Sequence, residues 1–453
     1  MRPDERPAAP ADASAANPAP LPYGRQTVDE ADVAAVVECL RGDRLTQGPQ
    51  VERFEEALCE ASGARHAVAV ASGTAALHLA CLALGVRPGD VGVTAAVTFV
   101  ASANCLAYCG GTPHFADVDP RTGLIDVASL AAVVDRLAAA GTPPKVLVPV
   151  DFAGQPADLP GVRAVADRVG AKVVADAAHS LGAAYRLSGT DGADGPVRRT
   201  GEGRLADATA FSFHPVKPVT TGEGGAVVTD DEGLAETVRE LRTHGIHRDP
   251  RRLTRPDEGP WYYEQNALGY HYRVTDLQCA LGRSQLRKLD AFLARRNAIA
   301  DQYWAALARA PFAGRVEPLA VRPETVRHGY HLFVIRLTPG AGETLESLAQ
   351  RRRTVFEALH RRGVLVQVHY VPVPMQPYYG GDASAFPRAQ AYYAGCVSLP
   401  IFPGLGEGDV RRVLDALADC LDEAPAPGSP APGPEAARGD RPAALSSQTV
   451  AMR

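Results

Sequence analysis

Residues 210–225 read AFSFHPVKPVTTGEGG, a strand-like aromatic run that ends in one lysine, Lys217, and continues into two threonines and a glycine turn. An ordinary lysine, with a pKa of about 10.4, is protonated at neutral pH, so imine chemistry needs a lysine held on a rigid and partly desolvated element. Pro215 and Pro218 stiffen the backbone on either side of Lys217. The stretch therefore presents Lys217 as a candidate Schiff-base lysine, with a surface lysine at a strand end as the alternative.

A second stretch, residues 67–85, reads AVAVASGTAALHLACLALG. It predicts a short apolar strand, a turn of small residues and an alanine-rich helix that ends at glycine. The start of such a helix points free N–H groups and a positive dipole end at whatever lies over Gly73 and Thr74, which suits a phosphate group. An ordinary helix N-cap has the same pattern, so a purely structural turn is the alternative.

A third stretch, residues 171–180, reads AKVVADAAHS and places Asp176 at the carboxyl end of an apolar strand. Open α/β sheets bind ligands at this edge. A carboxylate there can hold a pyridine nitrogen protonated, and His179 can bond the oxygen of the same ring. A helix N-cap for Asp176 and a satisfied polar histidine for His179 are the alternatives.

Residues 94–104, TAAVTFVASAN, place Phe99 where another strand ends and a helix begins. Its ring can stack on a flat ligand or fill the core. The four stretches follow one another as phosphate turn, aromatic residue, aspartate and lysine, each at a strand-to-loop junction. Besides its lysine, a pyridoxal phosphate enzyme needs an anchor for the phosphate, a carboxylate for the ring nitrogen and a flat partner for the ring, and these stretches supply all three.

From about Leu21 to Leu421 the chain resembles the DegT/DnrJ/EryC1/StrS sugar aminotransferases, which are pyridoxal phosphate enzymes of aspartate aminotransferase fold. It is most similar to the branch that aminates UDP-2-acetamido-2,6-dideoxy-4-keto-L-arabino-hexose to the UDP-4-amino-4,6-dideoxy-N-acetyl-L-altrosamine of the pseudaminic acid pathway. The closer likeness rests on YGRQ at 23–26, LTQG at 45–48, FEEALC at 54–59, PVDFAG at 149–154, SFHPVK at 212–217, WYYEQ at 261–265 and VQVHY at 366–370.

The resemblance implies that Lys217 forms the Schiff base and moves the reacting proton, while Asp176 pairs with the ring nitrogen. It also implies an active site between two subunits and hence a homodimer, the commonest symmetric assembly. Further coenzyme contacts are implied for the phosphate, the ring face and the ring oxygen: Gly73, Thr74 and Ser212 for the phosphate, Phe99 for the face, and His179 for the oxygen.

One position departs from the family. Relatives usually read Gly-Tyr-Asn-Tyr-Arg, and their asparagine reaches the partner's phosphate, whereas residues 269–273 here read GYHYR. His271 keeps one N–H donor and, when charged, adds an attraction to the phosphate, so we expect it to keep the contact and make coenzyme affinity pH-dependent. For the sugar or the amino donor, the candidate contacts are His214, His369 and Tyr370.

The activity implied is transfer of the amino group of L-glutamate to C4 of a UDP-linked 4-keto-6-deoxy-N-acetylhexosamine. One alternative is the same chemistry on another ketone, such as a dTDP-4-keto-6-deoxyhexose, a 3-keto sugar or a keto-cyclitol. A non-catalytic coenzyme-binding regulator is a further alternative, which Lys217 argues against.

Composition agrees with a soluble enzyme. The net charge is -5, from 47 basic and 52 acidic residues, so the composition lacks the basic excess that indicates binding to nucleic acids or membranes. No apolar run approaches the ~20 residues of a membrane helix, and residues 1–20 lack the apolar core of a secretion signal, so we predict a cytoplasmic protein. Cys105 and Cys109 have no partner ligands nearby in the sequence, so no metal site is predicted.

The predicted fold class is α/β, a type I pyridoxal phosphate transferase fold with a mostly parallel seven-stranded sheet. Residues 21–290 form the predicted coenzyme-binding domain and 291–423 a smaller α+β domain. Residues 1–20 and 424–453 are predicted to be disordered tails, and 188–203 a mobile loop. The strands expected in the sheet are 67–71, 91–96, 113–117, 145–150, 172–175, 208–212 and 225–228. Beyond the sheet we expect one long helix from about 275 into the 300s, strands at 331–337 and 364–369, and helices near 344–361 and 407–421.

Overall fold

The computed structural model describes residues 19–188 and 194–424. The two predicted tails therefore lie almost wholly outside the described residues, and so does the centre of the predicted loop.

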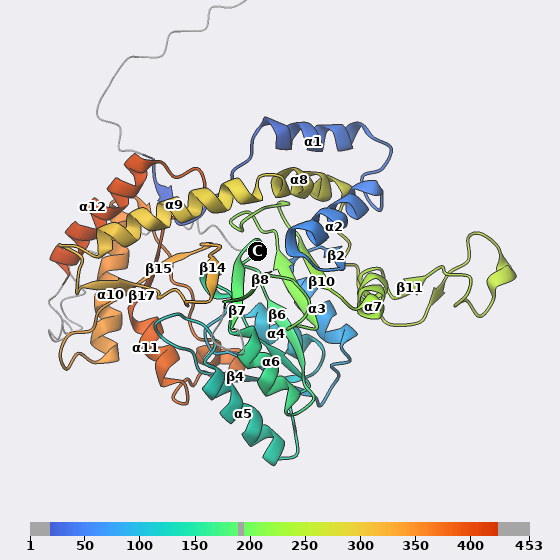
Figure 1. Ribbon diagram of the computed structural model, residues 1–453, viewed down its shortest axis with the longest axis horizontal. Helices are drawn as coiled ribbons and strands as arrows, with labels where there is room; N and C mark the ends of the chain where they lie inside the picture. Colours follow the sequence, from blue (N-terminus) through green and yellow to red (C-terminus); the bar gives the residue numbers. More distant parts are fainter. Residues whose placement is uncertain (1–18, 189–193, 425–453) are drawn as a thin grey trace, which may run out of the picture.

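A seven-stranded sheet forms the middle of the molecule (Figure 1). Its order is β2-β10-β9-β6-β5-β3-β4, and only β10 runs antiparallel to its neighbours. This confirms the predicted mostly parallel sheet. Its strands are short runs of Val and Ala, which can be buried on both faces of such a sheet. The strands are β2 (His66–Val70), β3 (Val91–Ala95), β4 (Thr112–Ala116), β5 (Val146–Val148), β6 (Lys172–Asp176), β9 (Ala208–Ser212) and β10 (Gly225–Thr229).

Helices cover both faces of this sheet. Alternate residues of one strand go to opposite cores: Val68 and Val70 pack with one set of helices, Ala67 and Ala69 with another. The first face carries α3 (Gly73–Ala83), α4 (Ala101–Tyr108) and α7 (Glu232–Arg242). The second carries α2 (Pro49–Ser62), α5 (Val127–Ala139), α6 (Leu159–Asp167), α8 (Asp276–Leu286) and the start of α9 (Leu289–Leu307). Helix α1 (Glu30–Arg41) lies against α8 at the top of Figure 1.

The expected single long helix is two helices, α8 and α9, and this prediction was wrong. They follow one another end to end and are separated by residues 287–288. At the break, Gln285 and Lys288 both donate to the buried carboxylate of Asp32 on α1. We attribute the break to this distant anchor, which no local pattern reveals.

The C-terminal part has a core of its own around β13 (Val316–Pro318), β15 (Phe333–Leu337) and β17 (Cys396–Leu399). Helices α10 (Leu345–Arg361), α11 (Pro387–Gly395) and α12 (Glu407–Glu423) accompany this antiparallel sheet. The start of the described chain returns here, because β1 (Leu21–Pro22) pairs with β16 (Val364–Leu365). The division at residue 290 stays a prediction.

The strand expected over 364–369 ends at Leu365. The amide of Val366 donates to the carbonyl of Val364, which closes a turn and stops the ladder. Beyond it, Gln367 forms only a single bridge with Ser398. The following residues are thereby free to leave the sheet and enter the candidate site.

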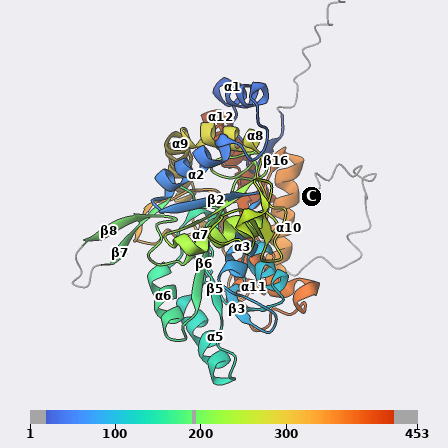
Figure 2. The ribbon, with the colours of Figure 1, turned by 90° about the vertical axis from the view of Figure 1, so that its right-hand side faces the viewer.

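The prediction of a mobile loop over 188–203 was also wrong in part. Residues 184–188 (β7) and 194–199 (β8) form an antiparallel hairpin, which projects from the body in Figure 2. A third strand, β14 (Thr325–Arg327), pairs with β7. The strand inside the predicted loop, β8, pairs with β7, which β14 holds on its other side, and this pairing outweighs the glycine-rich local composition.

A second projection runs from β11 (Ile246–His247) through η2 (Pro256–Glu258) to β12 (Glu264–Gln265) and reaches the right-hand edge of Figure 1. Two short 3-10 turns, η3 (Val373–Met375) and η4 (Pro377–Tyr379), lie before α11, and η1 (Phe152–Gly154) follows β5. No helix in the described ranges is long and apolar enough to cross a membrane.

Candidate active site

The candidate site lies at one edge of the central sheet, where three of its strands meet loops. β6 ends at Asp176 and β9 ends at Ser212. Gly225 on β10 pairs with both Ser212 and Val70, so the turn from β2 into α3 lies beside Ser212. The stretches that the sequence singled out are thus brought to a common edge, as expected for an open α/β sheet.

Asp176 is buried, with 5% of its surface exposed. Its Oδ2 accepts a hydrogen bond of 2.6 Å from Ser102 Oγ, and its Oδ1 accepts one of 3.1 Å from the amide of Ala178. Thr98 Oγ1 lies 2.7 Å from Ser102 Oγ and extends the chain of hydroxyls. Burial raises the pKa of Asp176, while these hydrogen bonds and the charge of Lys217 oppose that rise. A cation bound against this carboxylate would keep it ionised.

Lys217 lies in the turn after β9 and is half-buried. Its amide donates to the carbonyl of His214 at 2.9 Å. Desolvation lowers the pKa of Lys217 to about 8, although the charge of Asp176 acts in the other direction. The two threonines downstream hold the turn itself, since Thr220 donates to the carbonyl of Phe213 and Thr221 to that of Glu223. The side chain therefore has the rigid, partly desolvated surroundings that imine chemistry requires.

His179 is buried beside Tyr370 and His331. Its Nε2 lies 3.3 Å from the hydroxyl of Tyr370, and its ring centroid lies 4.4 Å from that of His331. Its Nδ1 has no hydrogen-bond partner within the part of the chain that the structure describes. Burial and the nearby charge of Lys217 hold the pKa of His179 well below its usual range, so the imidazole is neutral. A neutral buried ring with one open nitrogen can donate to or accept from a ligand oxygen.

The turn into α3 is built for close approach. Ser72 caps the helix, and its Oγ accepts from the amide of Ala75 at 3.1 Å. The amides of Gly73 and Thr74 lie in the first turn, where no helix carbonyl can accept from them. A Cβ on Gly73 would lie 2.8 Å from Cβ of Ser212, so only glycine fits. The Ser212 hydroxyl and the helix start thus form one cradle that suits a phosphate.

Phe99 is 47% exposed, which is unusual for a phenylalanine next to a buried site. Its ring centroid lies 6.1 Å from that of Tyr370. The exposed ring can pack against a flat ligand held between Asp176 and Lys217.

The substrate candidates are placed differently from one another. Tyr370 reaches His179, as described. His369 is buried and its Nδ1 lies 2.8 Å from Ser398 Oγ, while burial and the charge of Lys217 lower its pKa to about 3. His214 is half-buried, and burial lowers its pKa while Glu223 opposes the shift.

His271 is exposed, and its ring packs against His244 with centroids 5.5 Å apart. Its neighbours Tyr270 and Tyr272 stack on each other at 5.1 Å and pack on His78 of α3. Successive side chains of an extended segment point to opposite sides, so His271 faces away from α3. The structure therefore groups the other coenzyme candidates at the sheet edge and leaves His271 facing outward.

Taken together, these residues fit pyridoxal phosphate. Lys217 offers an amine and Asp176 a buried carboxylate for the ring nitrogen, and His179 offers the ring oxygen a nitrogen that no described residue bonds. The cradle of Gly73 and Ser212 excludes any larger side chain and suits the phosphate.

Sequence reasoning missed two residues of this site, Ser102 and His331. Ser102 lies in the first turn of α4, three residues after Phe99, and a hydroxyl at that spacing was the available signal. His331 lies just before β15 in the C-terminal part, 152 positions after His179, and no local signal marks it.

Comparison with known proteins gives consistent results. A family described as the DegT/DnrJ/EryC1/StrS aminotransferase family matches residues 26–418. The spore coat polysaccharide biosynthesis protein SpsC of Bacillus subtilis is 37% identical over 88% of this chain and 97% of its own length. Among solved structures, Helicobacter pylori PseC, an aminotransferase involved in the biosynthesis of pseudoaminic acid, is 29% identical, with a TM-score of 0.77 over 89% of this chain and 100% of its own. The putative sugar aminotransferase Spr1654 of Streptococcus pneumoniae, in its PMP form, is 28% identical, with a TM-score of 0.78 over 89% of this chain and 99% of its own.

Proposed function

Because this chain belongs to the DegT/DnrJ/EryC1/StrS aminotransferase family, we propose that it transfers the amino group of L-glutamate to C4 of a UDP-linked 4-keto-6-deoxy-N-acetylhexosamine. That it is a sugar aminotransferase using pyridoxal phosphate follows from the family and its solved relatives. The sugar, the donor and the residue roles below are our proposal.

The observation that carries the proposal is that Lys217 and Asp176 lie at the same edge of the sheet, near enough for the charge of each to act on the pKa of the other. Pyridoxal phosphate, when bound, supplies an electron sink and a carrier for the amino group. The protonated ring nitrogen would keep Asp176 ionised, and the ionised Asp176 would in turn keep that nitrogen protonated. Ser212 and the first amides of α3 bind the phosphate, and Phe99 covers the ring.

Lys217 is the general base and acid in this proposal. With its pKa lowered from 10.5 to about 8, the neutral fraction at pH 7 is roughly 300 times that of an exposed lysine. Its Nζ can therefore take a proton from the substrate carbon and return it nearby, as a general base and acid. His179, neutral and buried, orients the ring oxygen without adding charge.

The choice of sugar is supported by the likeness to PseC over 89% of this chain and by motifs such as VQVHY at 366–370. The same chemistry on another ketone stays the alternative, because SpsC, at 37% identity against 29% for PseC, is named for spore coat polysaccharide biosynthesis and not for pseudoaminic acid. A homodimer with shared sites and a cytoplasmic location stay predictions from the sequence.

The test is a half-reaction. The purified protein is loaded with pyridoxamine phosphate, and the coenzyme absorbance is followed after adding UDP-2-acetamido-2,6-dideoxy-4-keto-L-arabino-hexose. Its D-xylo epimer and a dTDP-4-keto-6-deoxyglucose serve as comparators.

Rapid appearance of the aldehyde absorbance with the L-arabino sugar alone would support the full proposal. A response only to a comparator would move the substrate and keep the transaminase. Silence with all three, in a protein that binds the coenzyme, would contradict the proposed class of acceptor.

A further inference from the structure

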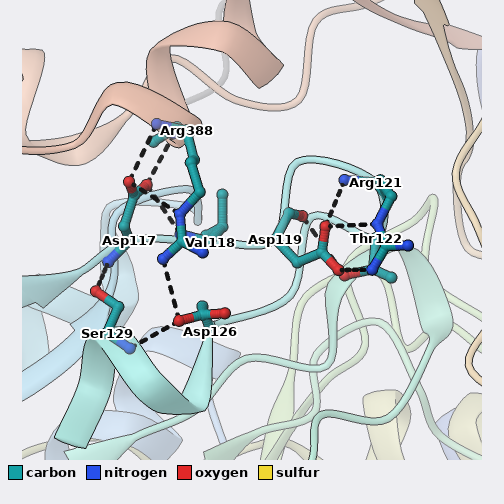
Figure 3. Close-up of polar contacts among 9 residues, drawn as sticks. Asp117, Val118, Asp119, Arg121, Thr122, Asp126, Ser129 and Arg388 are labelled. Atoms are coloured by element: carbon teal, nitrogen blue, oxygen red, sulfur yellow. Dashed lines mark hydrogen bonds and ion pairs between the residues drawn. The ribbon is translucent and has the colours of Figure 1, made fainter.

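Asp117 lies one residue beyond β4 and joins the large sheet to α11 of the C-terminal part (Figure 3). Asp117 is 95% buried, and its carboxylate accepts from the amides of Arg388 at 3.0 Å and Ala389 at 2.8 Å. These amides belong to the first turn of α11, which has Pro387 at its start and no side-chain cap of its own. Arg388 also reaches Asp126 at 3.0 Å. A carboxylate 271 positions away in sequence thus fixes where α11 begins.

The same helix carries Tyr392, which is fully buried. Its hydroxyl donates to the backbone carbonyl of His369 at 2.6 Å. Its ring meets Phe152 edge to face with centroids 5.9 Å apart, and Phe152 in turn packs on Tyr370 at 6.2 Å. The hydroxyl therefore ties α11 to the short segment that enters the candidate site.

That segment presents Tyr370. The Tyr370 hydroxyl lies 3.3 Å from Nε2 of His179, and its ring lies 6.1 Å from that of Phe99. Both neighbours belong to the proposed coenzyme site. A small shift of the His369 carbonyl would move Tyr370 relative to both, and misplacement of about 1 Å can lower a rate by about two orders of magnitude.

We propose that Asp117 and Tyr392 are positioning residues for this site: Asp117 fixes the start of α11, and the Tyr392 hydroxyl fixes where Tyr370 meets His179. The proposal rests on the proposed function only in assuming that the coenzyme lies beside His179. Neither residue is among the candidate contacts to the coenzyme or the substrate.

The main test compares Tyr392→Phe with Tyr303→Phe in the full-length, coenzyme-loaded protein. Tyr303 is a matched control, because it is also fully buried and its hydroxyl donates to one backbone carbonyl, that of Pro400, at 2.9 Å. The two variants lose the same kind of hydrogen bond, so their losses of stability should be alike. We expect kcat to fall about tenfold in Tyr392→Phe, with KM for the sugar changed by less than about twofold, and no such fall in Tyr303→Phe.

A second readout does not depend on turnover. The visible circular dichroism of the bound coenzyme reports how asymmetrically its ring is held, so its amplitude should change in Tyr392→Phe and stay unchanged in Tyr303→Phe. Equal kcat and equal spectra in the two variants would overturn the proposal. A wild-type protein with no coenzyme band would instead count against the proposed function.

Asp117→Asn provides the independent variant should Tyr392→Phe not fold. Asparagine keeps one acceptor oxygen and loses the charge at the start of α11. Its control is Asp231→Asn, because Asp231 caps α7 by accepting from the amide of Leu234 at 3.0 Å. We expect the altered circular dichroism in Asp117→Asn only, and spectra that match in both variants would contradict the role of Asp117.

Discussion

Lys217 is one of only four lysines among 453 residues, the others being Lys145, Lys172 and Lys288. Lys172 is bonded to Asp207, and Lys288 to Asp29 and Asp32. The nitrogens of these two lysines therefore already have carboxylate partners. Lys217 is the one whose pKa desolvation lowers to about 8. The scarcity of lysine makes its chemistry easy to isolate experimentally.

Uptake of pyridoxal phosphate by the coenzyme-free protein should follow the neutral fraction of Lys217. The rate should rise with pH and level off above about pH 8, because the pKa of Lys217 is lowered to about 8 from 10.5. Stopped-flow absorbance from pH 6 to pH 10 measures this. A rate that keeps climbing to pH 10 would show that Lys217 titrates as an exposed lysine does.

Asp176→Asn should lower turnover without lowering the unfolding temperature of the coenzyme-free protein. Burial raises the pKa of Asp176, so an ionised carboxylate costs folding free energy, and the coenzyme-free wild type loses stability as pH rises through that pKa. Asparagine lacks this cost, so the coenzyme-free variant should unfold at an equal or higher temperature at pH 8. Turnover should fall by about two orders of magnitude, since the ring nitrogen loses its charged partner. Near-normal turnover would exclude the proposed role.

At the residue scale, sequence reasoning found the side chains that stand at strand ends. Asp176, Ser212 and Lys217 follow apolar runs directly, so their common edge was predictable from the fold class. Ser102 and His331 were missed, because each reaches the site through packing between distant segments.

At the scale of elements, the phosphate cradle depends on how closely α3 approaches β9. Gly73→Ala would place a Cβ 2.8 Å from that of Ser212, so the helix start or the serine must move. We expect coenzyme affinity to fall by about two orders of magnitude, because the amides no longer converge on one phosphate. A fluorescence titration with pyridoxal phosphate measures the dissociation constant.

Gly408→Ala is the control for that change. Gly408 also lies in the first turn of a helix, α12, and a Cβ there would meet no atom of the described residues within 4 Å. Its affinity should match the wild type. If both alanine variants bind equally well, the tight approach of α3 and β9 does not define the phosphate site.

The elements themselves were predictable to an uneven degree. The seven strands of the central sheet were predictable from short runs of Val and Ala between turns, because a strand buried on both faces reads as one continuous apolar run. The break between α8 and α9 and the β7–β8 hairpin were missed. Both depend on partners far along the chain, Asp32 on α1 for the break and β14 for the hairpin.

At the scale of the whole molecule, the proposed homodimer gives His271 a task. It is exposed and faces away from α3 of its own chain, as expected for a side chain that serves a partner's site. Mixing Lys217→Ala with His271→Ala, after unfolding and refolding together, should create hybrid dimers with one intact site each. At limiting coenzyme, activity should recover to about a quarter of wild type, because half of randomly paired dimers are hybrids.

Size-exclusion chromatography with light scattering checks the assembly of each variant and of the mixture. Dimers without recovered activity would place His271 outside the partner's coenzyme site. A monomer would contradict the shared site altogether.

The most direct test of the central claim, that Lys217 carries the coenzyme, uses the four lysines. Borohydride reduces an imine between pyridoxal phosphate and a lysine to a stable amine, and mass spectrometry of the digested protein then finds the modified peptide. The account predicts modification of Lys217 and of none of Lys145, Lys172 and Lys288. Modification of another lysine, or none in a protein that has bound the coenzyme, would contradict it.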